Sequence, residues 1–417
     1  MSDKKRLIEN FLSLAILQGL NYFLPFITLP YLVRVLGPEN YGLVAFAQAF
    51  VQFFVLITDY GFNLSATNQI SVERDNHEKL RSIFSSVFVT KILLMIIALV
   101  TFSLLLVFVP KFKENQLLYL LTFGTVIGNT LFPVWFFQGL EVMKYITFLN
   151  VIIKISSTFG IFLFVKTSDD ILLLPLINSI SFIVVGVISL IIIKKNYNIY
   201  LLLPTIKEVR EQLIKGWHVF LTTISISLYT NANTFILGML TNNTIVGYYS
   251  SAEKLISAAN GMIQPITQVF FPYIGRVANN SKEQAVIIII KLLKNTFLIV
   301  GIVTVIIFIF SKEIVSLTLG EQYLESAKVL KILSIIPTLV LISNIVAIQG
   351  LVNFNKSRYV SQIAITAGII NLIAAPLFIL QYKHIGLAIS AVIVEVIVVV
   401  QGFYFFYKKV LMERDSR

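Results

Sequence analysis

The sequence predicts an all-α polytopic membrane protein with about 12 transmembrane helices in two lobes of six. Of its 417 residues, 57% are hydrophobic and only 13% are charged, and the mean hydropathy is +0.86. Soluble globular domains carry about 25% charged residues. Apolar runs of roughly 20 residues recur along the chain, and each is long enough to cross a bilayer as a helix. A transmembrane barrel would instead show alternating segments of about 10 residues.

Polar loops and helix breakers separate the predicted spans. The spans lie approximately at residues 11–36, 41–65, 83–109, 116–138, 142–165, 171–193, 217–240, 244–272, 286–310, 325–350, 359–381 and 385–407. The loop between the sixth and seventh spans contains Pro204 and a short amphipathic stretch, residues 206–214. We expect this stretch to lie on the inner membrane face as a linker helix, or to contact a partner or lipid headgroups. The expected domains are an N-lobe of residues 1–193, a cytoplasmic linker of residues 194–216 and a C-lobe of residues 217–417.

The distribution of basic residues orients the chain. About 20 Lys and Arg lie at the termini and in the loops on one side of the membrane, against about 7 on the other. The positive-inside rule therefore places both termini in the cytoplasm, and an even number of spans requires the same. We expect no cleaved signal peptide, because the first apolar run is too long and lacks a small-residue cleavage site.

The first two spans form a polar hairpin around a tight turn at Gly37-Pro38. Pro25 and Pro30 lie inside the first span and are expected to bend it, which membrane bundles tolerate. The hairpin carries an unusual number of polar side chains: Asn21, Thr28, Arg34, Gln48, Gln52, Asp59 and Asn63. Polar groups at bilayer depth usually face a bundle interior or a water-filled cavity. The hairpin is therefore predicted to line a polar cavity.

Two weak internal similarities indicate that the halves are repeats. The run Phe137 to Leu140 (FQGL), ending the fourth span, recurs as Ile348 to Leu351 (IQGL), ending the tenth. The run that begins at Gly42 aligns with the run that begins at Gly247, in the second and eighth spans. Six spans in each half would give both halves the same orientation. A parallel repeat of this kind places a cavity between two lobes and is a hallmark of secondary transporters.

Several cations lie inside the predicted spans, where a lysine costs about 2.5–3.5 kcal/mol at the bilayer centre. Lys154, near the middle of the fifth span, is expected to line the cavity or to pair with a carboxylate of the second or sixth span. Lys91 and Lys254, in the third and eighth spans, are further candidate substrate ligands. Arg34 is either an outer-interface anchor or part of the cavity rim. Lys291, at the start of the ninth span, is expected to extend to the inner headgroups.

The embedded acids are fewer: Asp59, Glu141, Glu253 and Glu395. Glu253 either neutralises Lys254 or Lys154, or it forms a coupling site for H⁺ or Na⁺, since a shielded carboxylate can bind a proton. Asp59 is the second coupling candidate, although a helix cap or a salt bridge to a loop arginine is an alternative. For Glu395, central in the last span, the sequence names no partner.

The sequence contains no catalytic or metal-binding constellation. The three histidines, His77, His218 and His384, lie in loops or at span ends, and cysteine is absent. We find no nucleophile elbow, zinc-protease motif or P-loop. We therefore expect a protein that is not an enzyme, with no metal and no ATP-driven transport. The net charge of +12 is attributed to membrane orientation and anionic lipid, with no nucleic-acid partner.

Three blocks of sequence resemble signatures of a known family, the O-antigen flippases of the Wzx type. The first is NYFLPFITLPYLVRVLGPENYGLVAFAQAF at residues 21–50, followed by TDYGFNLSATNQIS at residues 58–71. The second is FPVWFFQGLEVMKYIT at residues 132–147. The third is VGYYSSAEKL at residues 246–255, followed by Pro265 and the run Phe271 to Tyr273. The likeness extends from about residue 10 to about residue 400 and includes the expected number of spans.

The resemblance implies a member of the multidrug/oligosaccharidyl-lipid/polysaccharide superfamily, with two six-helix lobes that form a V around a central cavity. It implies that an undecaprenyl-pyrophosphate-linked oligosaccharide is moved from the inner to the outer leaflet by alternating access. A cationic cavity would shelter a headgroup that cannot cross hydrocarbon unaided. A bacterial inner membrane, a monomer, contact with membrane lipids, and a glycan polymerase with chain-length machinery as partners are further expectations. The candidate site residues come from span depth and are not transferred from family motifs.

Two other functions remain open at this point. A cation-coupled multidrug antiporter of the same superfamily would share the lobes but have a more acidic and apolar cavity. A membrane polysaccharide polymerase or ligase would need a large outer loop with acidic, Arg or His side chains, and every predicted outer loop is short.

Overall fold

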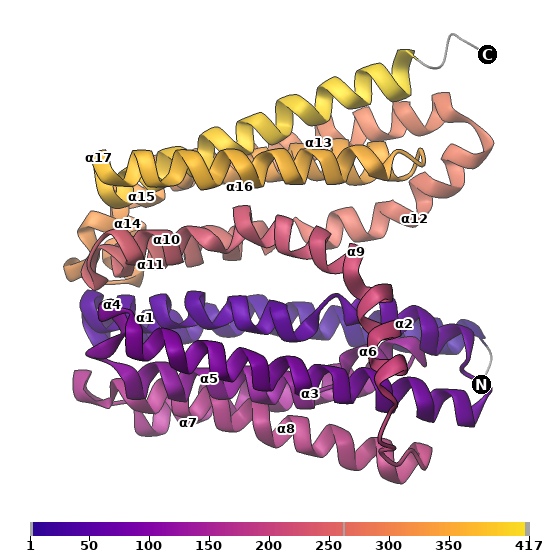
Figure 1. Cartoon of the computed structure of the whole chain (residues 1–417). Coiled ribbons are helices and arrows are strands. Elements are labelled where there is room, and N and C mark those ends of the chain that lie inside the picture. The colour runs from indigo at the N-terminus through magenta and orange to yellow at the C-terminus, as the bar shows by residue number, and fades with distance from the viewer. Residues whose placement is uncertain (1–2, 262, 413–417) are drawn as a thin grey trace. The chain divides into compact units, whose positions relative to one another are not determined.

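The computed structural model describes residues 3–261 and 263–412 (Figure 1). Within these ranges the regular elements are helices, and no strand is assigned. The side chains of residues 3–18, 20–23, 25, 228–230, 264–266 and 268 lie outside the description. The expected contribution of Asn21 to a cavity and the expected bend at Pro25 therefore cannot be placed. The predicted all-α fold is confirmed.

The helices group into two compact units by their internal packing. Unit 1 comprises residues 1–28 and 46–224, and unit 2 comprises residues 29–45 and 225–417. The hairpin tip, residues 29–45, thus groups with the second half of the chain although it belongs to the first half in sequence. These units do not coincide with the predicted lobes and linker, whose boundaries stay a prediction.

Unit 1 is built from the helices of the first half and most of α9. Their bounds are α1 Asp3–Asp59, α2 Phe62–Val72, α3 His77–Phe108, α4 Pro110–Lys113, α5 Gln116–Leu131, α6 Val134–Gly139, α7 Met143–Phe164, the 3₁₀ turn η1 Ser168–Leu172, α8 Leu173–Tyr197 and α9 Ile206–Thr230. The core lies among α2, α3, α6, α7 and α8, around the completely buried Trp135 and Phe136.

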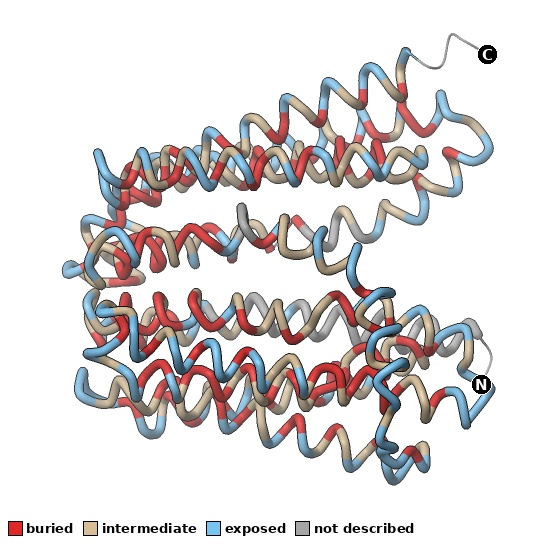
Figure 2. The backbone as a smooth tube through the Cα atoms, viewed as in Figure 1, coloured by how far each residue is buried: buried red, intermediate tan, exposed pale blue. Residues whose placement is uncertain are grey.

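Unit 2 contains the hairpin tip of α1 and the remaining helices. Their bounds are α10 Ala232–Leu240, α11 Asn243–Gly261, α12 Gln264–Asn280, α13 Lys282–Ile309, α14 Ser311–Thr318, η2 Glu321–Tyr323, α15 Leu324–Leu333, α16 Ile336–Asn344, the π-helix η3 Ile345–Val352, α17 Ser357–Phe406 and η4 Tyr407–Leu411. One core cluster lies among α13, α16, η3 and α17, where buried and exposed residues recur along both halves of α17 (Figure 2).

Two of the long helices contain a break in helical backbone geometry. Gly37 has a φ of 72° inside α1, so the predicted turn at Gly37-Pro38 is confirmed at a position where only glycine is unstrained. Lys383 has a φ of 52° inside α17 and separates the two predicted last spans. Among the described residues, eight helical stretches are long and apolar enough to cross a membrane, and two of these contain the breaks. The number of twelve crossings stays a prediction.

Other predicted spans are interrupted where the sequence carries a breaker. The span predicted at residues 116–138 is α5 and α6, separated at Phe132-Pro133 because proline cannot continue the hydrogen-bond ladder. The span predicted at residues 217–240 is wrong in its bounds, since α9 begins at Ile206 and ends at Thr230, before α10. The amphipathic linker stretch is therefore the first part of a longer helix.

The start of α9 is held on unit 1 by a polar network. Thr205 and Glu208 form reciprocal hydrogen bonds at the helix start, and Ser82 of α3 donates to the Glu208 carboxylate at 3.2 Å. These hydrogen bonds, chiefly from Thr205, lower the pKa of Glu208. Gln212 is 5% exposed and exchanges amide hydrogen bonds with Gln69 of α2. The start of α9 therefore packs against α2 and α3 through polar groups that have hydrogen-bond partners.

The two Gln-Gly pairs of the predicted repeat have different neighbours. A Cβ on Gly139 would lie 2.6 Å from Ile70 of α2, whereas a Cβ on Gly350 would lie 2.7 Å from Phe406 of α17. Gln349, in η3 of unit 2, donates to the Thr267 carbonyl oxygen of α12 at 2.6 Å. The repeat stays a prediction.

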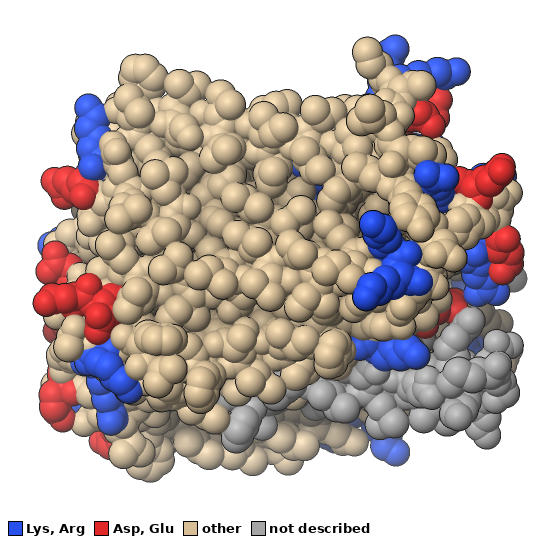
Figure 3. Space-filling view, turned by 90° about the horizontal axis from the view of Figure 1, so that it is seen from below, with Lys and Arg blue, Asp and Glu red and all other residues tan. Residues whose placement is uncertain are grey.

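The face drawn in Figure 3 has its charged side chains at the two ends and a broad uncharged band between them. Helices of unit 1 expose large apolar side chains, including Phe159 on α7 at 67% and Ile97 on α3 at 60%. Such a surface fits acyl chains better than water, because exposed apolar patches of this size are rare on soluble proteins. The protein is a multi-pass membrane protein.

Candidate functional site

Unit 1 buries an ion pair at membrane depth. Lys91 Nζ of α3 donates to Asp59 Oδ1, at the end of α1, at 2.8 Å, and Asn129 Nδ2 of α5 donates to Asp59 Oδ2 at 3.2 Å. Lys91 is 1% exposed, whereas 22% of the Asp59 side chain remains accessible. Buried charges are tolerated only when they are paired and hydrogen-bonded. The Asp59–Lys91–Asn129 cluster satisfies both requirements.

This arrangement differs from what the sequence led us to expect for both ions. Asp59 pairs with Lys91 rather than with a loop arginine, and Arg74 lies instead 3.6 Å from Glu141. Lys91 is directed to a carboxylate of its own unit rather than exposed on a cavity surface. Its role toward a substrate stays a prediction.

A polar stripe runs along α7 and contains the third candidate. Asn150, Lys154 and Ser157 lie four and three residues apart, so they share one helix face. Asn150 donates to its own helix at the Ile146 carbonyl oxygen at 2.8 Å, and Ser157 donates to Asn178 of α8. Lys154 is partly exposed between them. Lys154 therefore lies on a face of α7 that carries other polar side chains.

In unit 2 the candidate acid and cation lie side by side in sequence but differ in exposure. Glu253 of α11 is partly buried and accepts a hydrogen bond from Thr234 Oγ1 of α10 at 3.2 Å. Tyr41, from the hairpin tip, is 7% exposed and lies within electrostatic range of Glu253. Lys254 is exposed. The carboxylate thus points toward hydroxyl groups, while the neighbouring ammonium group is free to contact another molecule.

Two asparagines next to Glu253 were missed by sequence reasoning. Asn371 Nδ2 of α17 donates to Asn233 Oδ1 of α10 at 2.8 Å, and the residues are 1% and 6% exposed. Asn233 also hydrogen-bonds to Tyr249 of α11. Together with Glu253 and Thr234 they form the polar cluster of unit 2. The signal that could have found them is an asparagine inside an apolar span.

Arg34 contacts the C-terminal end of α14. Its guanidinium donates to the Leu317 carbonyl oxygen in the last turn of α14, where the helix dipole favours a cation. Gln322 reinforces the contact by donating to the Val33 and Arg34 carbonyl oxygens at 3.3 and 3.4 Å. Whether Arg34 is an outer-interface anchor or part of the cavity rim stays a prediction.

Glu395, for which the sequence named no partner, accepts a hydrogen bond from Ser343 of α16. The Ser343 Oγ to Glu395 Oε1 distance is 2.9 Å. The serine also donates to the Val340 carbonyl oxygen of its own helix. The partner was not predictable, because serine is common in apolar helices and gives no charge signal.

A polar pocket of about 370 Å³ lies where the predicted cytoplasmic loops of unit 1 meet α9. Its polar lining residues are Asn68, Gln69, Glu73, Lys79, Ser82 and Lys215. Lys79 lies 2.9 Å from Glu73, and Lys215 donates to Gln69 at 3.2 Å. Amide, carboxylate and ammonium groups together can bind sugar hydroxyls and phosphate oxygens.

Ionisable groups buried inside membrane helices are typical of a transporter, because such groups are expensive in hydrocarbon and usually mark a transport pathway. Similar proteins and structures agree with this class. The chain is 34% identical to a protein of Escherichia coli (strain K12) named "Putative O-antigen transporter", and the alignment covers 95% of this chain and 96% of that protein. A protein of the same name from Shigella dysenteriae is 29% identical over 94% of this chain and 98% of its own length.

Residues 7–278 match the family model described as "Polysaccharide biosynthesis protein". The chain belongs to this family. The resemblance predicted from the three sequence blocks is thereby confirmed.

Solved structures show which fold this family adopts. The structure "Lipid II flippase MurJ, inward closed conformation" matches with a TM-score of 0.77 at 16% identity, over 95% of this chain and 87% of that chain. An inward-facing multidrug resistance MATE family transporter of the MOP superfamily matches with a TM-score of 0.72 at 16% identity, over 94% and 96%. At this identity the likeness establishes the fold alone, which the chain shares with these two structures.

Proposed function

We propose that this protein is a flippase that moves an undecaprenyl-pyrophosphate-linked oligosaccharide from the inner to the outer leaflet of a bacterial inner membrane. The observation that carries the proposal is the 34% identity over nearly the whole chain to a protein named as an O-antigen transporter. The MOP fold and the ionisable groups within the spans support it. The activity that we propose is transport, not catalysis.

The physical task explains why cations are needed. A diphosphate with sugars cannot enter hydrocarbon, because an unpaired charge in a low-dielectric medium is strongly disfavoured. The exposed Lys254 and the partly exposed Lys154 are the candidates for contact with the diphosphate, in a cationic cavity that would open alternately to each leaflet. Arg34 holds the α14 end, and Lys91 neutralises Asp59, so both contribute to the cavity through the structure around it.

Ion coupling is assigned to Glu253 in preference to Asp59. Glu253 accepts a hydrogen bond from a hydroxyl group, and Lys254 beside it is exposed, whereas Asp59 has an ammonium group at 2.8 Å. Binding of H⁺ or Na⁺ to Glu253 would change the net charge of its cluster, so unit 2 could respond to a gradient. The proposal includes cytoplasmic termini, contact with membrane lipids, a monomeric state, and a glycan polymerase with chain-length machinery as partners.

A multidrug antiporter is the second candidate, because MATE structures share the fold. The exposed Lys254 argues against it, since a cationic drug would be repelled by an ammonium group next to the carboxylate.

The test is deletion of the gene in its own bacterium, followed by measurement of lipid-linked oligosaccharide and surface glycan. We expect lipid-linked oligosaccharide to accumulate and surface glycan to be lost, with both restored by the wild-type gene. Lys154→Ala should fail to restore glycan while the protein accumulates normally, and Lys291→Ala is the matched control that should restore it. Unchanged glycan in the deletion strain together with increased drug sensitivity would favour the antiporter.

A further inference from the structure

Glu395 lies midway along the second half of α17 and is not used by the proposed coupling at Glu253. It is about 18 Å along the helix from the break at Lys383 and about 17 Å from Phe406, where α17 ends, at 1.5 Å per residue. The hydrocarbon core of a bilayer is about 30 Å thick, so a residue midway along such a helix lies close to its centre. An ionisable side chain at this depth is expensive and usually has a function.

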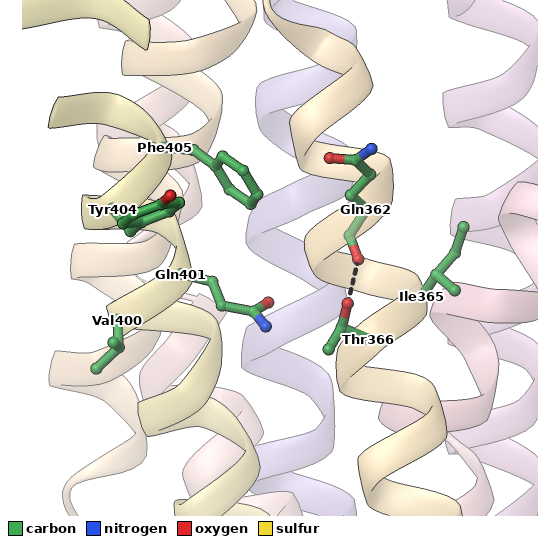
Figure 4. Close-up of a pocket in the computed structure, with 7 residues that line it drawn as sticks. All are labelled: Gln362, Ile365, Thr366, Val400, Gln401, Tyr404 and Phe405. Carbon is green, nitrogen blue, oxygen red and sulfur yellow. Dashed lines mark hydrogen bonds between the residues drawn. The ribbon is translucent and has the colours of Figure 1, made fainter. Parts of the chain in front are cut away.

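The face of α17 that carries Glu395 is otherwise apolar. Residues three and four positions away share a helix face. On this face they are Ala391, Val392, Val398 and Val399. Gln401 lies six positions away on another face, where it lines the groove between the two halves of α17 together with Gln362 (Figure 4). Glu395 therefore has no polar neighbour on its own helix face.

Ser343 of α16 is the only hydrogen-bond partner of Glu395 among the described residues, at 2.9 Å from Oγ to Oε1. The neighbouring elements α16 and η3 contain no ionisable side chain. Other helices of unit 2 near α17 do contain them, and in the described part of the chain none forms an ion pair or hydrogen bond with Glu395: Tyr248, Tyr249, Glu253 and Lys254 of α11, Lys282, Glu283, Lys291 and Lys294 of α13, and Glu325, Lys328 and Lys331 of α15.

An ionised Glu395 would be an embedded charge with one neutral donor. Asp59 shows what a carboxylate of this protein has at membrane depth, because it accepts from both Lys91 and Asn129. A single hydroxyl group cannot replace an ammonium group, since an ion in apolar surroundings needs an opposite charge as well as hydrogen bonds. A protonated carboxyl group carries no charge and needs no cation.

The number of hydrogens at Ser343 supports the protonated state. Ser343 Oγ lies 3.1 Å from the Val340 carbonyl oxygen and 2.9 Å from Glu395 Oε1. Both of these oxygens are acceptors when the carboxyl group is ionised, but a hydroxyl group has only one hydrogen to donate. With a proton on Glu395, the carboxyl group donates to Ser343 and Ser343 donates to Val340, so each hydrogen has its own acceptor.

We propose that Glu395 is a proton-binding site, in which the carboxyl group carries H⁺ and connects α17 to α16 through Ser343. Na⁺ does not fit this site, because hard cations take several oxygen ligands and Ser343 Oγ is the one side-chain oxygen that contacts Glu395 in the described chain. The site has no contact in common with Glu253. It does not rest on the proposed function, since the carboxyl group is protonated whatever molecule the protein transports.

The experiment is labelling of the full chain, purified in detergent, with dicyclohexylcarbodiimide, which reacts with protonated carboxyl groups in apolar surroundings. Peptide mapping by mass spectrometry measures the labelled fraction at each carboxyl group. At neutral pH we expect Glu395 to be labelled at least tenfold more than Asp59, which is the matched control because it is embedded but paired with Lys91. Labelling of Glu395 should decrease as pH rises, and it should be equal in sodium chloride and in choline chloride.

Infrared spectroscopy is a second measurement, in which no reagent has to reach the site. The carboxylic C=O band at neutral pH should lose intensity in Glu395→Gln, and this variant should keep the wild-type unfolding temperature because the amide both donates and accepts. Glu321→Gln is the matched control and should leave the band unchanged, since Glu321 also accepts from a serine, Ser316, but is exposed.

Three results would overturn the proposal. They are an unchanged C=O band in Glu395→Gln, labelling of Asp59 to the same extent as Glu395, and protection of Glu395 from the reagent by Na⁺. If the reagent labels neither residue, the infrared result decides.

Discussion

The polar clusters of units 1 and 2 differ in how their charges are paired, although the sequence predicts the two halves of the chain to be repeats. In unit 1, Asp59 and Lys91 form a buried ion pair with Asn129 as a further donor. In unit 2, Glu253 is hydrogen-bonded to a threonine hydroxyl, and Lys254 beside it is exposed. One unit therefore neutralises its carboxylate internally, and the other leaves its carboxylate and its lysine available.

This difference assigns different roles to similar residues. An ion pair that is satisfied within its own unit resists change, because removal of either partner leaves a buried charge. A carboxylate among hydroxyls and amides can gain or lose a cation while its neighbours stay hydrogen-bonded. An embedded charge therefore indicates function only when its partner is known. Each of the following substitutions changes the charge or the packing in one of the two units.

The largest effect is expected in unit 1. Asp59→Ala leaves Lys91 buried without a counterion, which should lower the free energy of unfolding by about 3–5 kcal/mol. The measurement is thermal unfolding of the purified protein in detergent, with its abundance in the membrane as a second readout. The expected result is a poorly accumulating and strongly destabilised variant.

The double variant Asp59→Asn with Lys91→Met is the control for that loss. It removes both charges and keeps similar volumes, so most of the stability should return, as is common when buried pairs are replaced. If the double variant is as unstable as Asp59→Ala, the charges are not the cause and the comparison between the units fails.

The second effect concerns the aligned glycines of the predicted repeat, which pack against each other. A Cβ on Gly42 would lie 1.8 Å from the Asn243 carbonyl oxygen, and a Cβ on Gly247 would lie 2.0 Å from the Pro38 carbonyl oxygen. Both contacts are with backbone, so the hairpin tip would have to move away from α11. Gly247→Ala should destabilise the protein by about 1–3 kcal/mol in thermal unfolding.

Gly301→Ala is the matched control, because nothing lies within 4 Å of its Cβ position inside α13. Alanine should be neutral or slightly stabilising there, since it has the better helix propensity. Equal effects of the two substitutions would show that the close approach of α1 and α11 does not contribute to stability.

The turn in α1 and the membrane helices could be predicted from the sequence because they depend on local chemistry. The turn at Gly37-Pro38 requires a positive φ, and the long apolar runs identify the membrane helices. The grouping of the hairpin tip with unit 2 was not predicted, because Gly42 and Gly247 are about 200 residues apart and their contact depends on tertiary packing.

The third effect falls on transport rather than stability. Glu253→Gln keeps an oxygen that can accept from Thr234, so the unfolding temperature should stay close to that of the wild type. The variant cannot bind H⁺ or Na⁺ as a carboxylate does, and surface glycan should fall at least tenfold. Asn371→Leu, which breaks the neighbouring amide pair, should instead lower stability. Normal glycan export with Glu253→Gln would remove this residue from the coupling site.

The candidate site was predicted less completely than the fold. Sequence depth alone identified the charged members, such as Lys91 and Glu253, because charge is conspicuous in an apolar span. It could not identify Asn129, Asn233 or Asn371, whose partners come from helices distant in sequence. Nor could it separate the buried Lys91 from the exposed Lys254, because only packing decides their exposure.

The smallest effect lies at the start of α9, which contacts unit 1 through groups outside the membrane spans. Hydrogen bonds from Thr205 hold the pKa of Glu208 below its ordinary value of 4.5. A carboxylate with a lowered pKa stabilises the folded state above that ordinary value, and the contribution is lost as pH falls through the folded pKa. Amide hydrogen exchange of residues 206–214, corrected for intrinsic rates, should therefore accelerate as pH falls below about 4.5.

Two variants separate this cap from general acid unfolding. Thr205→Ala removes the hydroxyl group that donates to the Glu208 carboxylate and accepts from the Glu208 backbone N–H. It should destabilise the start of α9 by about 1 kcal/mol at neutral pH. Glu208→Gln should lose the pH dependence of exchange in residues 206–214 while the rest of unit 1 keeps its own. If exchange in the Glu208→Gln variant still accelerates below the same pH, another titrating group causes the acceleration and Glu208 is not the source of the pH dependence.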